Sequence, residues 1–223
     1  MTSINPFGRG IFVVTRKSVL TGILELESRG LNSGTSGNLS ARLGGSFLIT
    51  PSGAVPTQLS ADQLVLVRID RDGASNLDGL VPSSEWQMHN DIYSCRNEVG
   101  AIAHFHSPYA TALACNNRRI PPFHYMVAVA GGEDIRCAPY ATFGTQTLSS
   151  SAVTALEGRK ACLLANHGVV CVGNDVAETV KLATEIELLA KTYILSLTIG
   201  SPDILSGSEM KKVIAKFRDY RSQ

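Results

Sequence analysis

The segment that decides the fold reads ACLLANHGVVCV, residues 161–172. Two short apolar runs, residues 161–165 and 169–172, flank the polar tripeptide Asn166-His167-Gly168. Each run has the length and composition of a buried strand. A connection of three residues suits antiparallel neighbours, because parallel strands need a crossover of a dozen or more residues. The segment therefore disfavours a purely parallel sheet.

The rest of the chain predicts further strands that alternate with helices. Residues 39–43 and 46–50 are typical of a second hairpin across Gly44-Gly45. Residues 64–69 and 101–105 are also expected as strands. Helices are expected at residues 15–30, 84–95, 107–115, 149–157, 175–199 and 208–218. The pattern predicts an α/β fold of the α+β type, a single domain with a mixed, mostly antiparallel central sheet flanked by helices.

The composition is that of a globular protein without a strong electric field. Hydrophobic residues make up 44% and charged residues 17%, and 20 Lys+Arg against 19 Asp+Glu leave a net charge of +1. We therefore expect neither nucleic acid nor a membrane as a partner. No apolar run approaches the ~18 residues of a membrane span, and Arg9, Arg16 and Lys17 break up the N-terminal apolar stretch that a signal peptide needs. A cytoplasmic location is expected.

The cysteines suggest neither a disulfide framework nor a thiolate zinc site. There are five, an odd number, and no Cys-x-x-Cys occurs. Cys162 and Cys171 lie in the apolar runs and are expected as small core residues, with a catalytic thiol as the alternative.

The histidines suggest a metal site. His104 and His106 end a predicted strand as His-x-His. Their side chains then share one face, with Cα atoms roughly 6.7 Å apart, so both imidazoles can reach one ion. The alternative is a pair of exposed or core-lining histidines. His167 lies in the polar break between two apolar strands, and a third imidazole would leave one coordination position open, as in catalytic sites.

The other two histidines lack this spacing. His89 is expected on a helix face, and His124 in a loop near a site.

A carboxylate and two serines stand together at the start of a predicted helix. Ser83 and Ser84 offer hydroxyl groups and helix-terminal N–H groups, which suit an anion. Glu85 would then lie beside that anion as a proton-transfer group. The alternative is an ordinary first-turn glutamate that complements the helix dipole.

Three short segments rich in hydroxyl groups and glycine are candidate phosphate loops: residues 35–38, 50–53 and 82–85. Hydroxyl and backbone N–H donors bind phosphate oxygens without any lysine. None is a P-loop and no Gly-x-Gly-x-x-Gly occurs, so each alone is also explained as a simple turn.

Taken together, the histidines, Glu85 and the candidate phosphate loops lie in sequence strings that resemble the class II aldolase/adducin family, most closely its L-fuculose-1-phosphate aldolases. The likeness runs from about residue 14 to residue 220, which leaves residues 1–13 as an N-terminal extension and residues 206–223 as a C-terminal helical tail of one domain, 1–223. The strings are GLNSGTSGNLS (30–40), ITPSG (49–53), LVPSSEWQMH (80–89), AHFHS (103–107), HYM with AGG (124–132), CAPYATFGT (137–145), ANHG (165–168) and KFRDY (216–220).

The resemblance implies a lyase that reversibly cleaves a ketose 1-phosphate of the L-fuculose 1-phosphate type. The products would be dihydroxyacetone phosphate and an aldehyde such as lactaldehyde, formed through a metal-stabilised enediolate. The family likeness also implies a homotetramer with sites between adjacent subunits.

The same resemblance assigns roles to residues. One zinc ion per subunit, with manganese, cobalt or iron not excluded, would be held by His104, His106 and His167. Glu85 would be the acid/base residue and an additional ligand before substrate arrives. Tyr125 would reach the neighbouring subunit's site, and Phe143 and Tyr220 would shape the aldehyde pocket. The phosphate would be bound by Thr35, Gly37, Asn38, Ser52, Gly53, Ser83 and Ser84.

Other functions remain open at this point. Pentulose-phosphate 4-epimerases, methylthioribulose-phosphate dehydratases and sugar-acid phosphate decarboxylases share the metal triad. Deoxypentulose phosphates are further candidate substrates. A non-enzymatic, adducin-like binding module is expected to lack the metal ligands, whereas this chain keeps all three histidines and Glu85.

Overall fold

The computed structural model describes residues 9–70, 75–76 and 80–221. The strands in this part of the chain are β1 (Asn38–Leu43), β2 (Ser46–Ile49), β3 (Val65–Arg68), β4 (Ser75–Asn76), β5 (Ala101–Phe105), β6 (Arg136–Ala138), β7 (Ala161–Leu164) and β8 (Gly168–Gly173). The helices are α1 (Arg9–Ser28), α2 (Trp86–Cys95), α3 (Pro108–Cys115), α4 (Gln146–Ala155), α5 (Val176–Ile199) and α6 (Gly207–Arg221), with 3₁₀ turns η1 (Pro56–Gln58), η2 (Ala61–Gln63) and η3 (Tyr125–Ala130).

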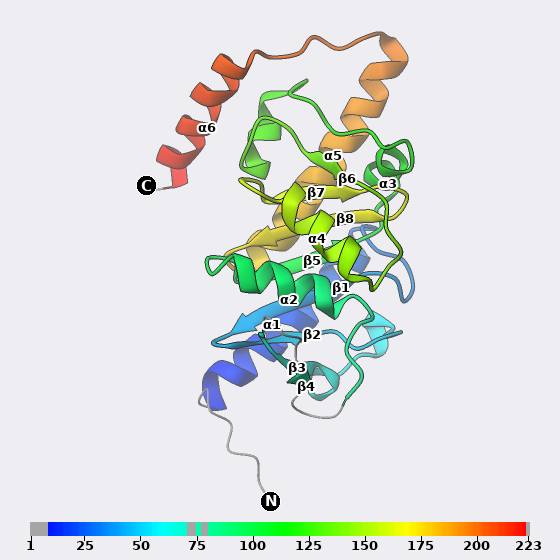
Figure 1. The fold of residues 1–223 in the computed structure, drawn as a ribbon, viewed down its shortest axis with the longest axis vertical. Coiled ribbons are helices and arrows are strands. Elements are labelled where there is room, and N and C mark those ends of the chain that lie inside the picture. The colour runs from blue at the N-terminus through cyan, green and yellow to red at the C-terminus, as the bar shows by residue number, and fades with distance from the viewer. Residues whose placement is uncertain (1–8, 71–74, 77–79, 222–223) are drawn as a thin grey trace, which may run out of the picture.

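One mixed sheet runs through the molecule (Figure 1). Its eight described strands lie in the order β4-β3-β2-β1-β5-β8-β7-β6. Every described neighbouring pair is antiparallel except β6 and β7, which are parallel. The predicted mixed, mostly antiparallel sheet flanked by helices is confirmed.

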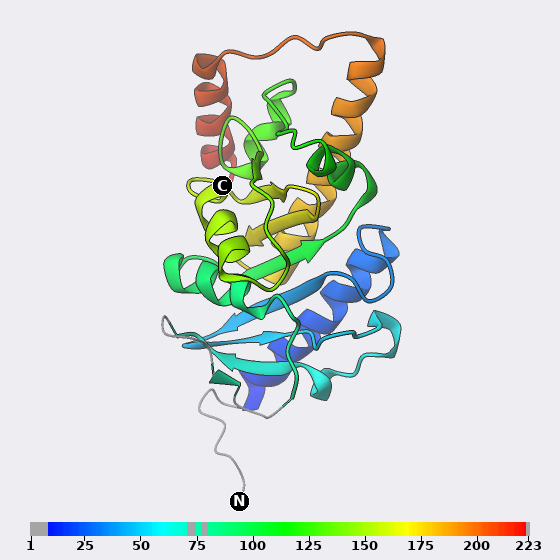
Figure 2. The same ribbon diagram turned by 45° about the vertical axis from the view of Figure 1, so that its right-hand side comes forward.

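Helices cover both faces of the sheet (Figure 2). Because side chains alternate along a strand, Leu39 and Phe105 pack on the face covered by α1, α3 and α5, and Phe47 and Ile102 pack on the face covered by α2 and α4. The same alternation places His104, two residues after Ile102, on the α2 side. The sheet therefore directs one of its own histidines toward the start of α2.

Both predicted hairpins are present. Gly44 turns β1 into β2 with a φ of +58°, and Asn166 turns β7 into β8 with a φ of +54°. Asparagine tolerates this left-handed conformation better than most residues. His167 is thereby held at the end of the sheet, between two strands that are buried throughout. Cys162 and Cys171 are buried core residues of these strands, as expected.

Some boundaries differ from the prediction. Helix α1 begins at Arg9 rather than at residue 15. Its first turns carry exposed Ile11, Val13 and Val14, so no one-sided apolar pattern marks them. Helix α4 begins at Gln146 rather than residue 149, because the Thr145 side chain accepts a hydrogen bond from the N–H of Leu148 and caps it.

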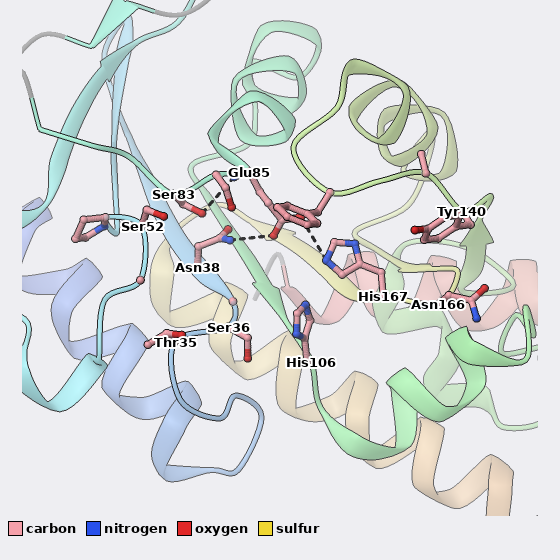
Figure 3. Close-up of a pocket in the computed structure, with 16 residues that line it drawn as sticks. Thr35, Ser36, Asn38, Ser52, Ser83, Glu85, His106, Tyr140, Asn166 and His167 are labelled. Carbon is pink, nitrogen blue, oxygen red and sulfur yellow. Dashed lines mark hydrogen bonds and ion pairs between the residues drawn. The ribbon is translucent and has the colours of Figure 1, made fainter.

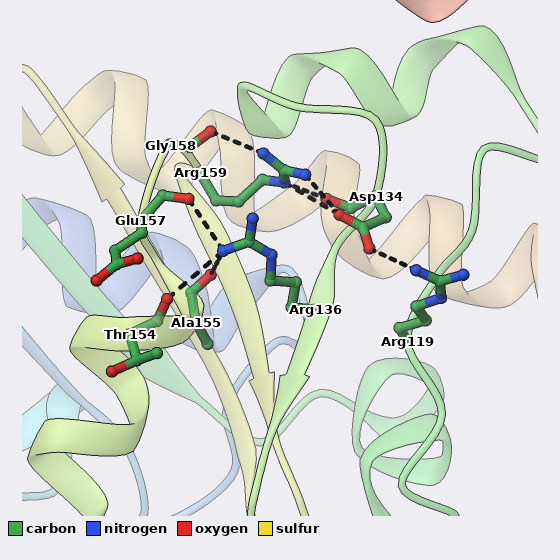
Figure 4. Close-up of polar contacts among 8 residues, drawn as sticks. All are labelled: Arg119, Asp134, Arg136, Thr154, Ala155, Glu157, Gly158 and Arg159. Carbon is green, nitrogen blue, oxygen red and sulfur yellow. Dashed lines mark hydrogen bonds and ion pairs between the residues drawn. The ribbon is translucent and has the colours of Figure 1, made fainter. Parts of the chain in front are cut away.

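Strand β6 has no counterpart in the prediction. It is only three residues long, and polar contacts at its start fix its place (Figure 4). Arg136 donates to the carbonyl of Glu157, just beyond α4, at 3.0 Å. Asp134 binds Arg159 at 2.7 Å and Arg119 at 3.0 Å. These contacts join distant segments, so no local pattern of residues indicates the strand.

Helix α6 stands apart from the sheet and packs beside η3, with Met210 buried (Figure 1). It occupies most of the expected C-terminal tail. Of the expected N-terminal extension, residues 1–8 lie outside the described part, and residues 9–13 belong to α1. None of the described helices has the length and apolar character to cross a membrane.

A glycine at the start of β5 is predicted to be essential for stability. The N–H of Gly100 donates to Gly173, and an added Cβ would lie 1.8 Å from the carbonyl oxygen of Asn174. Backbone cannot move aside cheaply, so Gly100→Ala is expected to lower the free energy of unfolding by about 2–4 kcal/mol. Urea denaturation measures the change.

The matched control is Gly45→Ala, because nothing lies within 4 Å of a Cβ added to Gly45 in the first hairpin. Equal unfolding midpoints for the two variants would contradict the close approach at Gly100.

Candidate active site

A cavity of about 320 Å³ lies at the end of the sheet where β1 begins, β5 ends and the β7–β8 turn is located. It is large enough for a small ligand. Predicted site residues that line it are Thr35, Gly37, Asn38, Ser52, Gly53, Ser83, Ser84, Glu85, His106, Phe143 and His167. Further lining residues, to which the sequence analysis gave no role of their own, are Ser36 and Pro51 of the candidate phosphate loops and Tyr140, Ala141 and Asn166.

The three predicted imidazoles converge beside this cavity. One ring nitrogen of each of His104, His106 and His167 lies within 4.8 Å of the others. The Nε2 atoms of His104 and His106 are 3.0 Å apart. Two nitrogens bound to one tetrahedral ion at about 2.0–2.1 Å lie roughly 3.3 Å apart. The spacing thus suits ligands of a single metal ion.

Backbone groups hold two of these rings in place. His104 Nδ1 lies 3.0 Å from the carbonyl oxygen of Val169 and donates a hydrogen bond to it, which directs Nε2 toward the centre. An added Cβ on Gly168 would lie 2.5 Å from Cδ2 of His106. Glycine at position 168 therefore lets the turn that carries His167 approach His104 and His106. Its place next to His167 in the sequence suggests the same.

Glu85 completes the convergence from the start of α2 (Figure 3). Its Oε2 lies 2.8 Å from His104 Nε2 and accepts a hydrogen bond from Asn38 Nδ2 at 3.2 Å. Its Oε1 lies 3.3 Å from His167 Nε2 but is buried without a hydrogen-bond partner. A buried acceptor without a donor is costly.

The protonation states of these groups also favour a cation. Burial alone would raise the pKa of Glu85, but the charge and hydrogen bond of His104, together with His167 and Asn38, hold this pKa at about 2. Burial and then the charge of His104 lower the pKa values of His106 and His167 to about 4. At neutral pH these two rings are neutral and their lone pairs are available, as metal binding requires.

The donor set therefore fits a divalent metal ion. Ring nitrogens of three histidines and the carboxylate of Glu85 converge on one point, and a cation bound there would satisfy all of these buried acceptors at once. Nitrogen ligands with one carboxylate are typical of zinc and of neighbouring transition metals.

Hydrogen-bond donors gather on one side of this centre. Figure 3 shows Thr35, Ser52 and Ser83 on the side away from Tyr140 and Asn166. They come from the loop before β1, the loop after β2 and the segment before α2, so three loops distant in sequence meet here.

Glycine is needed where the first of these loops approaches β5. Gly37 has a φ of +84°, and an added Cβ would lie 2.8 Å from the carbonyl oxygen of His104. The loop therefore reaches the metal ligands only with glycine at this position.

Tyr125 is a predicted site residue that does not line the cavity of its own chain. Tyr125, in η3, is 51% exposed and stacks on Phe217 of α6, with ring centroids 6.4 Å apart and planes 10° apart. Tyr220 belongs to α6, but its side chain lies outside the described part of the chain. His124 caps η3 by accepting a hydrogen bond from the N–H of Met126.

The sequence analysis missed the part played by His89. This residue is fully buried and its Nε2 lies 2.6 Å from Asn38 Oδ1. The available signal was its spacing: His89 follows Glu85 by four residues, and residues four apart share one helix face.

Comparisons with known proteins agree with this geometry. The family described as "Class II Aldolase and Adducin N-terminal domain" matches residues 18–194. A 5-methylthioribulose-1-phosphate/5-deoxyribulose-1-phosphate aldolase of Rhodospirillum rubrum is 47% identical over 95% of this chain and 94% of its own length. An L-fuculose phosphate aldolase of Escherichia coli is 41% identical over 92% of this chain and 94% of its own length.

A solved structure of an L-fuculose 1-phosphate aldolase superposes with a TM-score of 0.86 at 38% identity, over 92% of this chain and 96% of that chain. The resemblance carried by the sequence strings is confirmed, and the chain belongs to the class II aldolase family.

Proposed function

We propose that this protein is a metal-dependent aldolase that reversibly cleaves a ketose 1-phosphate to dihydroxyacetone phosphate and a short aldehyde. One observation carries the proposal: three imidazoles and a carboxylate converge beside hydroxyl-rich loops in one cavity. Membership of the class II aldolase family supports the reaction type.

The ion, zinc by preference, would be held by His104, His106 and His167, with Glu85 as a further ligand before substrate binds. Manganese, cobalt and iron also accept imidazole ligands. A divalent ion supplies a Lewis acid that stabilises the negative charge left when the carbon–carbon bond breaks.

The phosphate of the substrate would occupy the donor-rich side of the cavity. Thr35, Ser52 and Ser83 lie on that side in Figure 3, and Gly37, Asn38, Gly53 and Ser84 line the same cavity. Binding a remote phosphate orients the reacting carbons, so binding energy far from the breaking bond contributes to rate.

Glu85 would move the proton at the reacting carbon of dihydroxyacetone phosphate. In cleavage the bond between the third and fourth carbons breaks, the electron pair stays on the third carbon, and Glu85 delivers a proton there. The hydroxyl proton on the fourth carbon must leave at the same stage. Tyr125 would accept that proton, and would return it to the aldehyde oxygen in synthesis.

Tyr125 would act in the site of a neighbouring copy. It is half exposed and lies outside the cavity of its own chain. Phe143 and Tyr140, on the rim of the cavity, are also more than 60% exposed, as expected for a site that a second copy covers. We therefore propose a homotetramer with sites between adjacent subunits.

The aldehyde end of the cavity favours an apolar group. Tyr140, Ala141 and Phe143 line it, and Tyr220 would close it from the C-terminal tail. L-fuculose 1-phosphate and 5-deoxypentulose 1-phosphates both end in a methyl group. The second class is favoured by the 47% identical relative, whose name carries methylthio and deoxy substrates.

The metal site is tested by removing one ligand. His106→Ala is expected to lose most of the bound ion and at least about 100-fold in cleavage rate, because a two-histidine site binds the ion weakly. Metal analysis of the purified protein and release of dihydroxyacetone phosphate are the measurements. His124→Ala serves as the control for metal content alone, because His124 caps the turn that carries Tyr125. Full activity with stoichiometric metal in His106→Ala would rule out the triad.

The proton-transfer residue is tested separately from cleavage. Glu85→Gln is expected to keep the ion but to lower exchange of the carbon-bound proton of dihydroxyacetone phosphate with deuterated water by about 10²–10⁴-fold. Glu98→Gln, which removes an exposed carboxylate paired with Arg96, is the matched control. Unchanged exchange in Glu85→Gln would remove this residue from the role.

Substrate preference is tested with two compounds that differ by one hydroxyl. The metal-loaded protein is expected to cleave 5-deoxyribulose 1-phosphate with a kcat/KM about 10-fold above that for ribulose 1-phosphate, because a hydroxyl without a partner at the apolar end costs about 1–2 kcal/mol. Release of dihydroxyacetone phosphate is measured, with L-fuculose 1-phosphate and 5-methylthioribulose 1-phosphate alongside. Carbon dioxide or an epimer as product would indicate one of the other family activities.

A further inference from the structure

A line of buried polar side chains crosses the contact between helix α2 and strand β1. Asn38 and Ser40 project from β1, and Glu85, His89 and Tyr93 project from α2 and its N-cap. All five are at most 6% exposed. Beside this line, α2 packs on the sheet through apolar residues such as Phe47, Ile92 and Ile102, and Arg42 of β1 donates to the carbonyl oxygens of Tyr93 and Arg96 at the far end of the helix.

The spacing between side chains on one face of helix α2 matches the spacing on one face of strand β1. Four residues of helix advance about 6 Å, and two residues of strand advance about 6.7 Å. Successive helix turns therefore meet successive strand residues of the same face. Alternation along β1 sends Leu39 and Ala41 to the opposite, apolar face, so only the polar set of β1 meets α2.

Hydrogen bonds connect this line to the carboxylate. Tyr93 Oη lies 2.8 Å from Ser40 Oγ, Ser40 Oγ lies 2.7 Å from His89 Nδ1, and His89 Nε2 lies 2.6 Å from Asn38 Oδ1. Asn38 Nδ2 then donates to Glu85 Oε2 at 3.2 Å.

The chemistry of each group decides the direction of each bond. An ionised carboxylate only accepts, so the amide nitrogen of Asn38 must face Glu85 and the amide oxygen must face His89. That oxygen also only accepts, so His89 carries its proton on Nε2. Nδ1 then accepts from Ser40, and Ser40 in turn accepts from Tyr93.

His89 stays neutral in this environment. Burial, followed by the charge of His104, lowers its pKa to about 3, against the opposing effect of Glu85. Both ring nitrogens of neutral His89 are hydrogen-bonded, one to Ser40 and one to Asn38. Only the tautomer with the proton on Nε2 satisfies both partners.

The other orientation of Asn38 is unfavourable at both ends. A turned amide would place its oxygen against the carboxylate of Glu85 and its nitrogen against the N–H of His89. Without His89, Asn38 loses one of the two contacts that fix its orientation, and its amide is held in place only by Glu85 Oε2.

We propose that His89 is a positioning residue that orients the Asn38 amide, and through it the Glu85 carboxylate, for proton transfer. The proposal rests on the proposed aldolase function. Asn38 occupies Glu85 Oε2, which leaves Oε1, the oxygen without a hydrogen-bond partner, for the cavity. The Tyr93 hydroxyl lies outside this path, since Ser40 donates to His89 with or without it.

Three variants test the proposal. His89→Phe keeps a ring but removes both nitrogens, and is expected to lower the rate of proton exchange in dihydroxyacetone phosphate by about 10- to 100-fold per bound metal ion. KM for dihydroxyacetone phosphate is expected to stay within about 3-fold, because the phosphate loops are untouched. His89→Gln, which offers one acceptor and one donor on a planar amide, is expected to restore most of the rate.

Tyr93→Phe is the matched control for stability. It removes a buried hydroxyl one turn further along the same helix and is expected to lower the unfolding midpoint while leaving the exchange rate unchanged. An exchange rate that falls equally in Tyr93→Phe and His89→Phe, or that falls only as bound metal is lost, would overturn the positioning role.

A spectroscopic measurement is independent of activity. In protein with isotope-labelled histidine, nitrogen NMR is expected to show His89 as the neutral Nε2–H tautomer between about pH 5 and 8. A protonated ring, or the Nδ1–H tautomer, would overturn the proposal. A wild-type protein that binds metal but exchanges no proton would instead refute the proposed function. The tautomer of His89 would still report the direction of the hydrogen bonds from Ser40 through His89 to Asn38.

Discussion

The site depends on one constraint: nitrogen and oxygen atoms that can bind a metal are held close together in the buried interior. His104 Nε2 faces His106 Nε2 at 3.0 Å and Glu85 Oε2 at 2.8 Å. A cation bound between them would satisfy these buried groups at once. The surrounding strands and turns keep them together, since His104 is anchored by the Val169 carbonyl and the His167 turn closes on β5 through Gly168. The stability of the fold thus maintains a cation site.

Strand β1 serves the core and the site at once. Leu39, Ala41 and Leu43 pack with α1 and α5, and the alternate residues Asn38 and Ser40 meet α2. A slip of one residue in its pairing would exchange these faces. The register that buries the apolar residues therefore also places Asn38 beside Glu85, so core packing and catalytic geometry are specified by the same pairing.

The two ends of the cavity differ in chemical character. Loops before β1, after β2 and before α2 bring hydroxyl groups to one end. The segment before α4 brings Tyr140 to the other end and adds Phe143 to the lining, and both side chains remain largely exposed in a single chain. This division agrees with relatives whose names share a ketose phosphate but differ in the rest of the sugar.

The sequence by itself determined the hairpins, most elements, the three histidines and Glu85, because short periods and local turns leave a pattern in consecutive residues. It left β6 undetected, placed the start of α1 too late, and assigned His89 only to a helix face. Only the tertiary structure decided that His89 meets Asn38 and that β6 pairs with β7. The physical reason is that these contacts join segments tens of residues apart, and their energies come from packing and burial that no local pattern records.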